Sequence, residues 1–207
     1  MTSPDETSTD ETSTNETSGH HDLPAAARTR RREERLIAAG LTSDDEIDEF
    51  LTGLYTSATP GNGARMAARA WTDPAYRDLL LSDGNAAAAR EGFGELSYQL
   101  RVVANAEDVH NVIVCTLCSC YPVSLLGPSP GWYKSFAYRS RTVREPRAVL
   151  GEFGLKLPPE VQISVWDSTS EARYMVLPAR PAGTGGLAAD ELAALVTRNG
   201  LIGTALV

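Results

Sequence analysis

The sequence predicts an α+β fold, because helical patterns fill its first half and strand patterns appear only in its second half. Helical periodicity and capping signals begin at Pro24 and recur as far as Arg90. Strand patterns start after Leu96 and recur within residues 161–177. Helices and strands therefore do not alternate along the chain, which disfavours a doubly wound α/β fold.

Residues 23–63 are expected to form an N-terminal helical arm. Pro24, followed by three alanines and a terminal Gly40, is typical of one helix. A second helix begins at residues 42–44, where Glu46 completes a capping-box pattern. Its apolar residues share one face: Ile47, Phe50, Leu51 and Leu54. Both helices bury little by themselves, so the arm needs a surface to pack on, either a partner's or that of its own domain.

Residues 64–207 are expected to form the second domain, after a loop at Gly61-Asn62-Gly63. Three helical patterns open this domain, and Asp73-Pro74 caps the second; the helices cover residues 64–71, 74–81 and 86–90. Strand patterns follow at residues 96–104, 109–114, 161–166, 171–177 and, as a last short strand, 201–206. An irregular stretch covers residues 121–131, and helices are expected near residues 132–138, 145–152 and 189–197.

The net charge of −8 comes mostly from the N-terminus. Residues 1–22 contain six of the 27 acidic residues and no Lys or Arg, so 21 acids face 19 bases in the rest of the chain. Such a polar, acidic and repetitive segment buries too little apolar surface to offset its ordering entropy, and a disordered acidic tail is expected. The nearly neutral body lacks the basic footprint of a nucleic-acid-binding protein.

The chain shows no signal that would direct it to or across a membrane. It has no apolar run of about eighteen residues, and its N-terminus lacks a basic region followed by an apolar stretch. We therefore expect no membrane association and a cytoplasmic location, where thiols stay reduced.

All three cysteines lie within six residues, Cys115, Cys118 and Cys120. A disulfide framework spreads its cysteines along the chain, so this clustering indicates a metal site instead. The backbone amides of Ser119 and Cys120 lie between the last two sulfurs. One ion that took both sulfurs and both amide nitrogens would close relaxed rings of six, five and five atoms, counted from the covalent bonds. Cys115 could then occupy an axial position, which leaves one coordination position open for chemistry.

This donor set favours a trivalent, low-spin, six-coordinate ion such as Co(III) or Fe(III), because a deprotonated amide is a strong-field donor. Two alternatives without catalysis remain open. His110 has the H-x4-C spacing to complete a structural zinc site with the cysteines. Cys115 and Cys118 also have the Cys-x-x-Cys spacing of a redox module, although that leaves Cys120 unexplained.

The segment Val112–Pro122, which reads VIVCTLCSCYP, resembles the metal-binding loop of nitrile hydratase α subunits. Further segments resemble the same family and together cover most of residues 64–206: 70–74, 138–147, 165–168, 177–184, 196–198 and 201–203. The Cys-x-x-Cys-Ser-Cys loop is shared only with close relatives such as thiocyanate hydrolase. The resemblance implies an N-terminal helical arm followed by a layered α-β-β-α metal-binding domain.

The resemblance also implies an activity, the hydration of R–C≡N to R–CO–NH2. It implies one metal ion per chain, held by the sulfurs of Cys115, Cys118 and Cys120 and the amide nitrogens of Ser119 and Cys120. The family oxidises the residue matching Cys118 to sulfinic acid and the one matching Cys120 to sulfenic acid, and Cys118, Ser119 and Cys120 are the expected catalytic residues. The nucleophile is either a water or the sulfenate oxygen of Cys120.

The resemblance implies that this chain works only in a heteromer. A β subunit, either one chain or two smaller ones, supplies arginines to the oxidised sulfurs, and an activator protein loads the metal. The helical arm is expected to bind that partner. Arg139, Arg141, Arg144 and Arg147 are candidates to stabilise the loop, although surface ion pairs are the default expectation for most of them.

Four positions near the cysteines bear on the metal and the substrate. Thr116 and Tyr121 resemble cobalt-type loops, so cobalt as Co(III) is expected, with Fe(III) as the alternative. Where many relatives have an aromatic residue, this chain has Val123-Ser124, which suggests a pocket for a larger, heteroaromatic nitrile. Within the same chemistry, the alternative is the metal-binding subunit of a thiocyanate hydrolase.

Overall fold

The computed structural model describes residues 24–207, apart from the side chain of Leu54. The predicted acidic tail, residues 1–22, lies outside the described residues. The chain divides into two compact units, and the second runs from Thr52 to Val207. This second unit contains both sheets and all three cysteines.

The two predicted helices of the arm are present. Helix α1 covers Ala25–Ala38 and is followed by Gly40 in the left-handed conformation, with φ of +67°. Helix α2 covers Asp44–Ser57. The expected capping box forms before it: the Ser43 amide donates to the Glu46 carboxylate at 2.9 Å, and the Glu46 amide donates to the Ser43 hydroxyl at 3.2 Å. No residue of α1 is buried.

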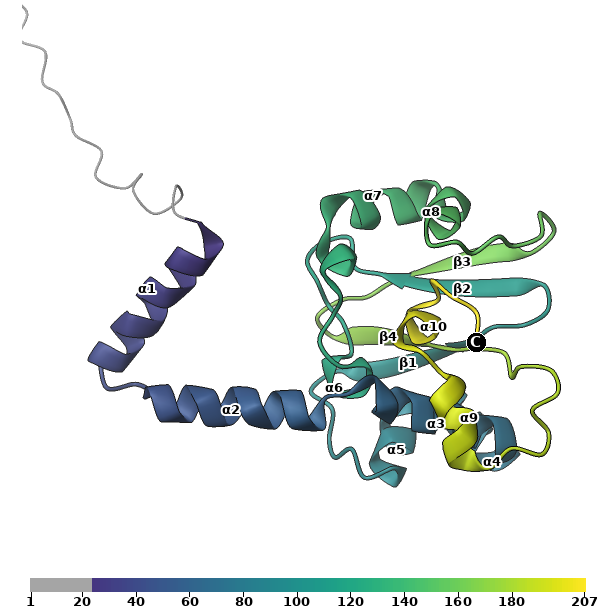
Figure 1. Cartoon of the computed structure of the whole chain (residues 1–207), viewed down its shortest axis with the longest axis horizontal. Helices are drawn as coiled ribbons and strands as arrows, with labels where there is room; N and C mark the ends of the chain where they lie inside the picture. Colours follow the sequence, from purple (N-terminus) through teal and green to yellow (C-terminus); the bar gives the residue numbers. More distant parts are fainter. Residues whose placement is uncertain (1–23) are drawn as a thin grey trace, which may run out of the picture. The chain divides into compact units, whose positions relative to one another are not determined.

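Four strands form two parallel pairs in the second unit (Figure 1). Strand β1, Gln99–Ala104, pairs with β4, Ala172–Leu177, and β2, Val109–Val114, pairs with β3, Gln162–Asp167. The four strand patterns that the sequence predicts at these positions are therefore confirmed. Parallel pairing places the carboxyl ends of β2 and β3 together, with Val114 opposite Asp167.

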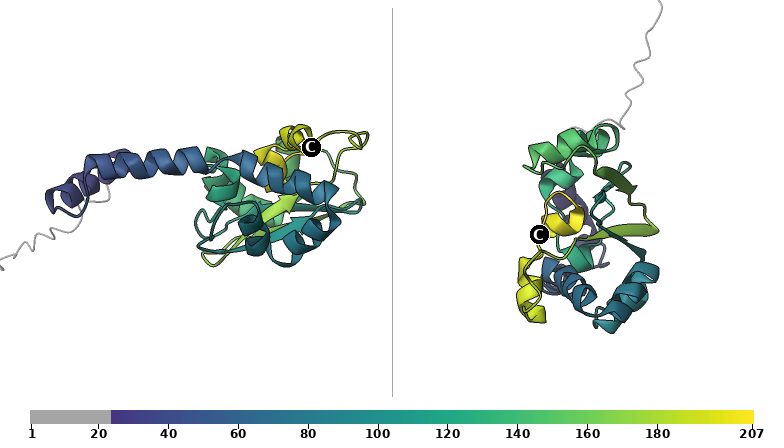
Figure 2. Two further views of the ribbon diagram at one scale, coloured as in Figure 1. Left: turned by 90° about the horizontal axis from the view of Figure 1, so that it is seen from below. Right: turned by 90° about the vertical axis from the view of Figure 1, so that its right-hand side faces the viewer.

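Helices cover the two pairs of strands on opposite sides, as Figure 1 and the right-hand view of Figure 2 show for the second unit. One side carries α7, Phe136–Arg144, and α8, Pro146–Glu152, which contact β2 and β3. The other side carries four helices: α3, Pro60–Thr72; α4, Pro74–Ser82; α5, Gly84–Arg90; and α9, Ala189–Leu195. The layered α-β-β-α arrangement is thus confirmed. A single large core of buried apolar side chains fills the space between the layers.

The predicted loop at Gly61-Asn62-Gly63 is wrong, because these residues form the first turn of α3. Thr59 caps this helix by accepting from the Gly61 amide, and Pro60 occupies the first helical position. Gly63 serves close packing rather than a turn: a Cβ there would meet Leu201 Cδ1 at 2.8 Å. The Thr-Pro cap is the sequence signal that outweighs the two glycines.

The predicted final strand at residues 201–206 is also wrong. This segment begins inside helix α10, Arg198–Ile202, whose first turn is capped by the Thr197 hydroxyl accepting from the Gly200 amide at 3.1 Å. Gly203 ends the helix with φ of +90°. A five-residue helix is too short to show a helical period, so the mostly apolar residues 201–206 resemble a strand in the sequence.

Two further elements differ from the prediction. A short helix α6, Val123–Leu126, lies inside the stretch expected to be irregular. The helix expected near residues 132–138 is instead two elements, a 3-10 turn η1 at Gly131–Lys134 and then α7, separated at Ser135, whose hydroxyl accepts from the Tyr138 amide at 3.2 Å. Within the described residues, no helix is long and apolar enough to cross a bilayer.

Candidate metal centre

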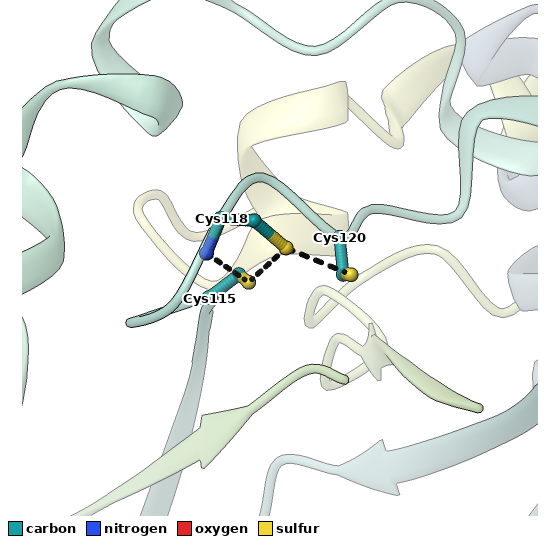
Figure 3. Close-up of side chains that lie close together, drawn as sticks. All are labelled: Cys115, Cys118 and Cys120. Carbon is teal, nitrogen blue, oxygen red and sulfur yellow. Dashed lines mark hydrogen bonds between the residues drawn. The ribbon is translucent and has the colours of Figure 1, made fainter. Parts of the chain in front are cut away.

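The three cysteine sulfurs meet directly after β2, at the carboxyl end of the β2–β3 pair. Their Sγ atoms all lie within 4.8 Å of one another (Figure 3). Cys118 lies between the other two: its sulfur is 3.5 Å from that of Cys115 and 3.2 Å from that of Cys120. The structure therefore brings together the three sulfurs that the sequence singles out, as free thiols rather than a disulfide.

The spacing of the sulfurs tests which coordination geometry they fit. With a metal–sulfur bond of about 2.3 Å, a right angle at the ion separates two sulfurs by about 3.3 Å and a tetrahedral angle by about 3.8 Å. The 3.2 Å between the sulfurs of Cys118 and Cys120 matches the right angle, and the 3.5 Å between those of Cys115 and Cys118 lies midway between the two values. The Cys118 amide donates to the Cys115 sulfur at 3.3 Å, and the backbone amides of Ser119 and Cys120 contribute to lowering the pKa of the Cys118 thiol. The donor set fits an octahedral ion better than tetrahedral zinc.

The three thiols differ in exposure and acidity. Cys115 is buried, with 1% of its surface exposed, whereas Cys118 is exposed and Cys120 is intermediate. Hydrogen bonds from the thiols of Cys120 and Cys115 lower the pKa of Cys118 to about 7. Burial raises the pKa of Cys120 to about 12. At neutral pH, Cys118 is therefore more readily ionised than Cys120, and ionised thiols are the form that binds metals.

Side chains from outside the loop hold its main chain. The Asp167 carboxylate, at the end of β3, accepts from the Thr116 amide at 2.9 Å and from the Thr116 hydroxyl at 2.5 Å. The Arg139 guanidinium donates to the carbonyls of Cys115 at 3.0 Å and Thr116 at 2.7 Å. Of the four arginines considered from the sequence, Arg139 is the one that contacts the loop. Asp167 was not foreseen, because only the strand register places it beside Thr116.

Removing the Asp167 carboxylate is expected to weaken metal retention. Asp167→Ala deletes both bonds to Thr116, and loss of such an outer contact typically costs about 10–100-fold in metal affinity or activity. Asp167→Asn can keep both bonds if the Thr116 hydroxyl becomes the acceptor, so it should recover most of the loss. Metal content after dialysis against a chelator measures the effect. Asp83→Asn, which alters a distant helix cap, is the control. If Asp167→Ala, Asp167→Asn and Asp83→Asn all retain the same amount of metal, Asp167 does not contribute to metal retention.

The other three arginines serve the surroundings of the loop rather than the loop itself. Arg141 forms exposed ion pairs with Glu145 and Glu152, each at 2.6 Å. Arg144 donates to the carbonyl of Ser140 in its own helix. Arg147 donates to three carbonyls of the segment that leads into β3, those of Leu157, Pro158 and Val161. The expected ion pairs are therefore found for Arg141, whereas Arg144 and Arg147 donate to backbone carbonyls instead.

Buried tyrosines also contact the loop, and sequence reasoning missed them. The Tyr133 hydroxyl donates to the Cys120 carbonyl at 3.0 Å, and the Tyr138 hydroxyl donates to the Ile113 carbonyl at 2.7 Å. Both rings belong to an aromatic cluster that includes Tyr121 and Trp132. Burial raises the pKa of both hydroxyls, so both stay neutral donors. The spacing of aromatic residues in the sequence does not reveal which carbonyls they reach.

His110 does not join the cysteines, so a zinc site completed by this residue is ruled out by the structure. Among the described residues, the group able to hold a metal consists of the three cysteines. The His110 ring is buried. Its Nε2 lies 2.7 Å from the Gly203 carbonyl oxygen, and its Nδ1 lies 3.3 Å from the side-chain nitrogen Nδ2 of Asn105. A neutral ring that donates through Nε2 and accepts through Nδ1 satisfies both contacts.

The buried His110 is expected to make stability fall in mild acid. Burial lowers the folded-state pKa of His110, whereas the unfolded chain keeps a value of about 6.5. Below that pH the unfolded state binds the proton first, so the free energy of unfolding decreases as pH falls from about 6.5 toward the folded-state pKa. His110→Gln should flatten this dependence. The pH dependence is measured as the urea midpoint of unfolding between about pH 7.5 and pH 5.5. If the midpoints of wild type and His110→Gln change with pH in parallel, His110 is not the cause.

Val123 and Ser124 lie at the start of α6, directly after the loop, and both are partly exposed. The Ser124 hydroxyl lies 2.8 Å from the Tyr98 hydroxyl, and its carbonyl accepts from Asn62 at 2.8 Å. The Arg173 guanidinium stacks over the Tyr98 ring at 4.4 Å and donates to the Tyr121 carbonyl at 2.8 Å. Ser124 is therefore held in place, while Val123 presents a small apolar side chain beside the cysteines in the chain.

Comparisons with known proteins agree with these features. Residues 24–205 match the family described as "Nitrile hydratase, alpha chain". The low-molecular weight cobalt-containing nitrile hydratase subunit alpha of Rhodococcus rhodochrous is 47% identical over 182 residues, which cover 87% of this chain and 88% of that one. Thiocyanate hydrolase subunit gamma of Thiobacillus thioparus is 50% identical over 185 residues, 84% of this chain and 76% of that one.

A similar solved structure is that of a double mutant of the Fe-type nitrile hydratase from Comamonas testosteroni Ni1. It has a TM-score of 0.83 and 40% sequence identity, and the match covers 89% of this chain and 92% of that one. The similarity therefore extends over the described chain, in sequence as well as in fold, and includes the cysteine loop. The chain belongs to the nitrile hydratase alpha-chain family.

Proposed function

We propose that this chain is the α subunit of a nitrile hydratase, which adds water to a nitrile to form the amide. The observation that carries the proposal is the meeting of the three cysteine sulfurs at the end of β2, within 4.8 Å of one another. We assign the sulfurs of Cys115, Cys118 and Cys120 and the amide nitrogens of Ser119 and Cys120 as the metal ligands. The activities named for the relatives support this assignment.

We propose cobalt, as Co(III), for this site. The relative from Rhodococcus rhodochrous is named as cobalt-containing, whereas the solved neighbour from Comamonas testosteroni is Fe-type, and iron is the alternative. When bound, such an ion supplies Lewis acidity that polarises the nitrile. The chain's own part is to hold the ligands: Cys115 anchors the buried side of the loop, and the exposed Cys118 faces solvent.

We further propose that Cys118 carries a sulfinic acid and Cys120 a sulfenic acid in the working enzyme. The exposure of Cys118 and its lowered pKa favour its oxidation, because oxidants attack the thiolate. Oxidised sulfurs need cationic partners, whereas the nearby Arg139 directs its Nε and Nη2 donors to loop carbonyls. A β subunit, one chain or two, is therefore proposed to supply arginines over the exposed side of Cys118.

The test is to produce the chain with its β partner and a metal-loading activator protein, in medium that contains cobalt. The expected complex contains one cobalt per chain, a sulfur-to-metal charge-transfer absorption, and a loop peptide with two oxygens on Cys118 and one on Cys120. It converts a nitrile to the amide. Zinc with unmodified cysteines and no amide formation would overturn the proposal. We also propose a cytoplasmic location, because clustered cysteines that form no disulfide with one another suit a reducing compartment.

The substrate is proposed to be a nitrile larger than the small aliphatic ones. Val123 is small and partly exposed beside the loop, so it leaves room that an aromatic residue would fill. We expect kcat/KM for a cyano-heterocycle to exceed that for acrylonitrile; the reverse preference would reject this extension. The thiocyanate hydrolase relative supports a second candidate, which the release of carbonyl sulfide from thiocyanate would reveal in the same complex.

A further inference from the structure

Apart from Asp167, which holds Thr116, the side chains that bind the main chain of the cysteine loop come from one neighbouring segment. In the part of the chain that the structure describes, no backbone–backbone hydrogen bond involves residues 115–120. Three side chains from residues 133–139 donate instead to four carbonyls at both ends of the loop. We call these side chains the tyrosine–arginine brace: Tyr133, Tyr138 and Arg139.

The members of the brace act at different places. Tyr138 holds the carbonyl of Ile113, which is still inside β2. Arg139 holds the carbonyls of Cys115 and Thr116, at the start of the loop. Tyr133 holds the carbonyl of Cys120, at 3.0 Å. It is therefore the only member of the brace that contacts the far end, where the last sulfur and one of the proposed amide donors belong to the same residue.

Tyr133 is itself rigidly held. Its side chain is fully buried and lies edge-on to the Tyr121 ring, with 5.0 Å between the ring centroids. Its hydroxyl also interacts with the hydroxyl of Ser168, and the Ser168 amide donates to the Val114 carbonyl at 2.7 Å. The Tyr133 hydroxyl thus links the end of the loop to the strand from which the loop begins.

We propose that Tyr133 is a positioning residue that fixes Cys120. By doing so it sets the distance between the Cys118 and Cys120 sulfurs at which the two residues bind the metal. This inference rests on the proposed function. Cys115 is fixed by burial and by Arg139, and Cys118 is exposed between the two ends. Without the Tyr133 hydroxyl, Cys120 can shift relative to Cys115, because the other side-chain contacts of the loop hold Cys115, Thr116 and the Cys118 amide rather than the Cys120 carbonyl.

The test compares Tyr133→Phe with wild type in the assembled, cobalt-loaded complex. The change keeps the buried ring and removes only the donor. We expect assembly and cobalt content to be retained, the sulfur-to-metal charge-transfer band to shift, and kcat to fall about tenfold with KM changed less than about twofold. An unshifted band with unchanged kcat would overturn the proposal.

Tyr76→Phe is the matched control. Tyr76 is also fully buried, and its hydroxyl donates to the Ala87 carbonyl at 3.2 Å, between α4 and α5. This variant should lose comparable stability but keep the band and kcat of wild type. If both variants shift the band equally, Tyr133 has a general packing role and the proposal fails.

A nonnatural residue covers the case in which Tyr133→Phe does not assemble. The amino acid 4-fluorophenylalanine at position 133 fills most of the hydroxyl's volume but cannot donate, and the same shift and loss of kcat are expected. Failure of this protein to assemble as well would mean that the hydroxyl is required for folding, and would overturn a positioning role. A wild-type complex that lacks cobalt and forms no amide would instead reject the proposed function.

Discussion

Cys118→Ser is expected to yield a folded complex that retains no cobalt and forms no amide. Cys118 is exposed and lies 3.5 and 3.2 Å from the other two sulfurs, so its replacement removes the donor that links them. A serine hydroxyl is a hard and weakly acidic donor, which suits a soft thiolate site poorly. Lewis-acid stabilisation is worth several kcal/mol, and about 1.4 kcal/mol is tenfold in rate, so kcat/KM should fall at least about a thousandfold.

Cobalt analysis and the amide assay on the same preparation measure this result. Cys115→Ser and Cys120→Ser should behave alike, although Cys115 is buried and its loss also affects packing. Ser119→Ala is the matched control in the loop, because the proposed ligand at this position is the backbone nitrogen and only the exposed hydroxyl is lost. Full activity in Cys118→Ser, or equal losses in Cys118→Ser and Ser119→Ala, would contradict the ligand assignment.

The sequence predicted the elements that have local signals. The capping box at Ser43 and Glu46 and the alternation in β1 are patterns of neighbouring residues, and both match the structure. The errors arose where a local signal favours one structure and packing another. Gly61 and Gly63 suggest a loop, but Gly63 allows α3 to lie against Leu201. The apolar end of the chain suggests a strand, but Thr197 and Gly203 bound a helix there.

The candidate site shows the same division. The spacing of the cysteines fixes which atoms can share one ion, since ring size depends only on bonds within the loop. What surrounds the loop depends on register and on side-chain direction. Asp167 reaches Thr116 because β2 and β3 are parallel and Val114 lies opposite Asp167. Tyr133 reaches Cys120 because η1 brings its side chain back to the end of the loop. Neither contact has a sequence spacing that could be read in advance.

Gly203→Ala is expected to prevent stable folding, although the residue lies near the C-terminus and far along the chain from the last cysteine. An added Cβ would collide with the carbonyl oxygen of Asn111 and lie 2.8 Å from Val112 Cα, both in β2. Backbone atoms of a buried, paired strand cannot move aside as a flexible side chain can. The φ of +90° adds strain for any residue with a Cβ. The shift would displace β2, which leads directly into Cys115.

Gly183→Ala separates the two causes of this effect. Gly183 also has a positive φ, +79°, but a Cβ there meets nothing within 4 Å. It should therefore cost only backbone strain, about 1–2 kcal/mol, and lower Tm by a few degrees. Gly203→Ala carries the same strain plus the collision, and we expect a loss of more than about 4 kcal/mol, seen as little soluble complex. Similar melting temperatures for the two variants would mean that the C-terminal turn moves away from β2, and that its packing does not hold the strand that positions the cysteines.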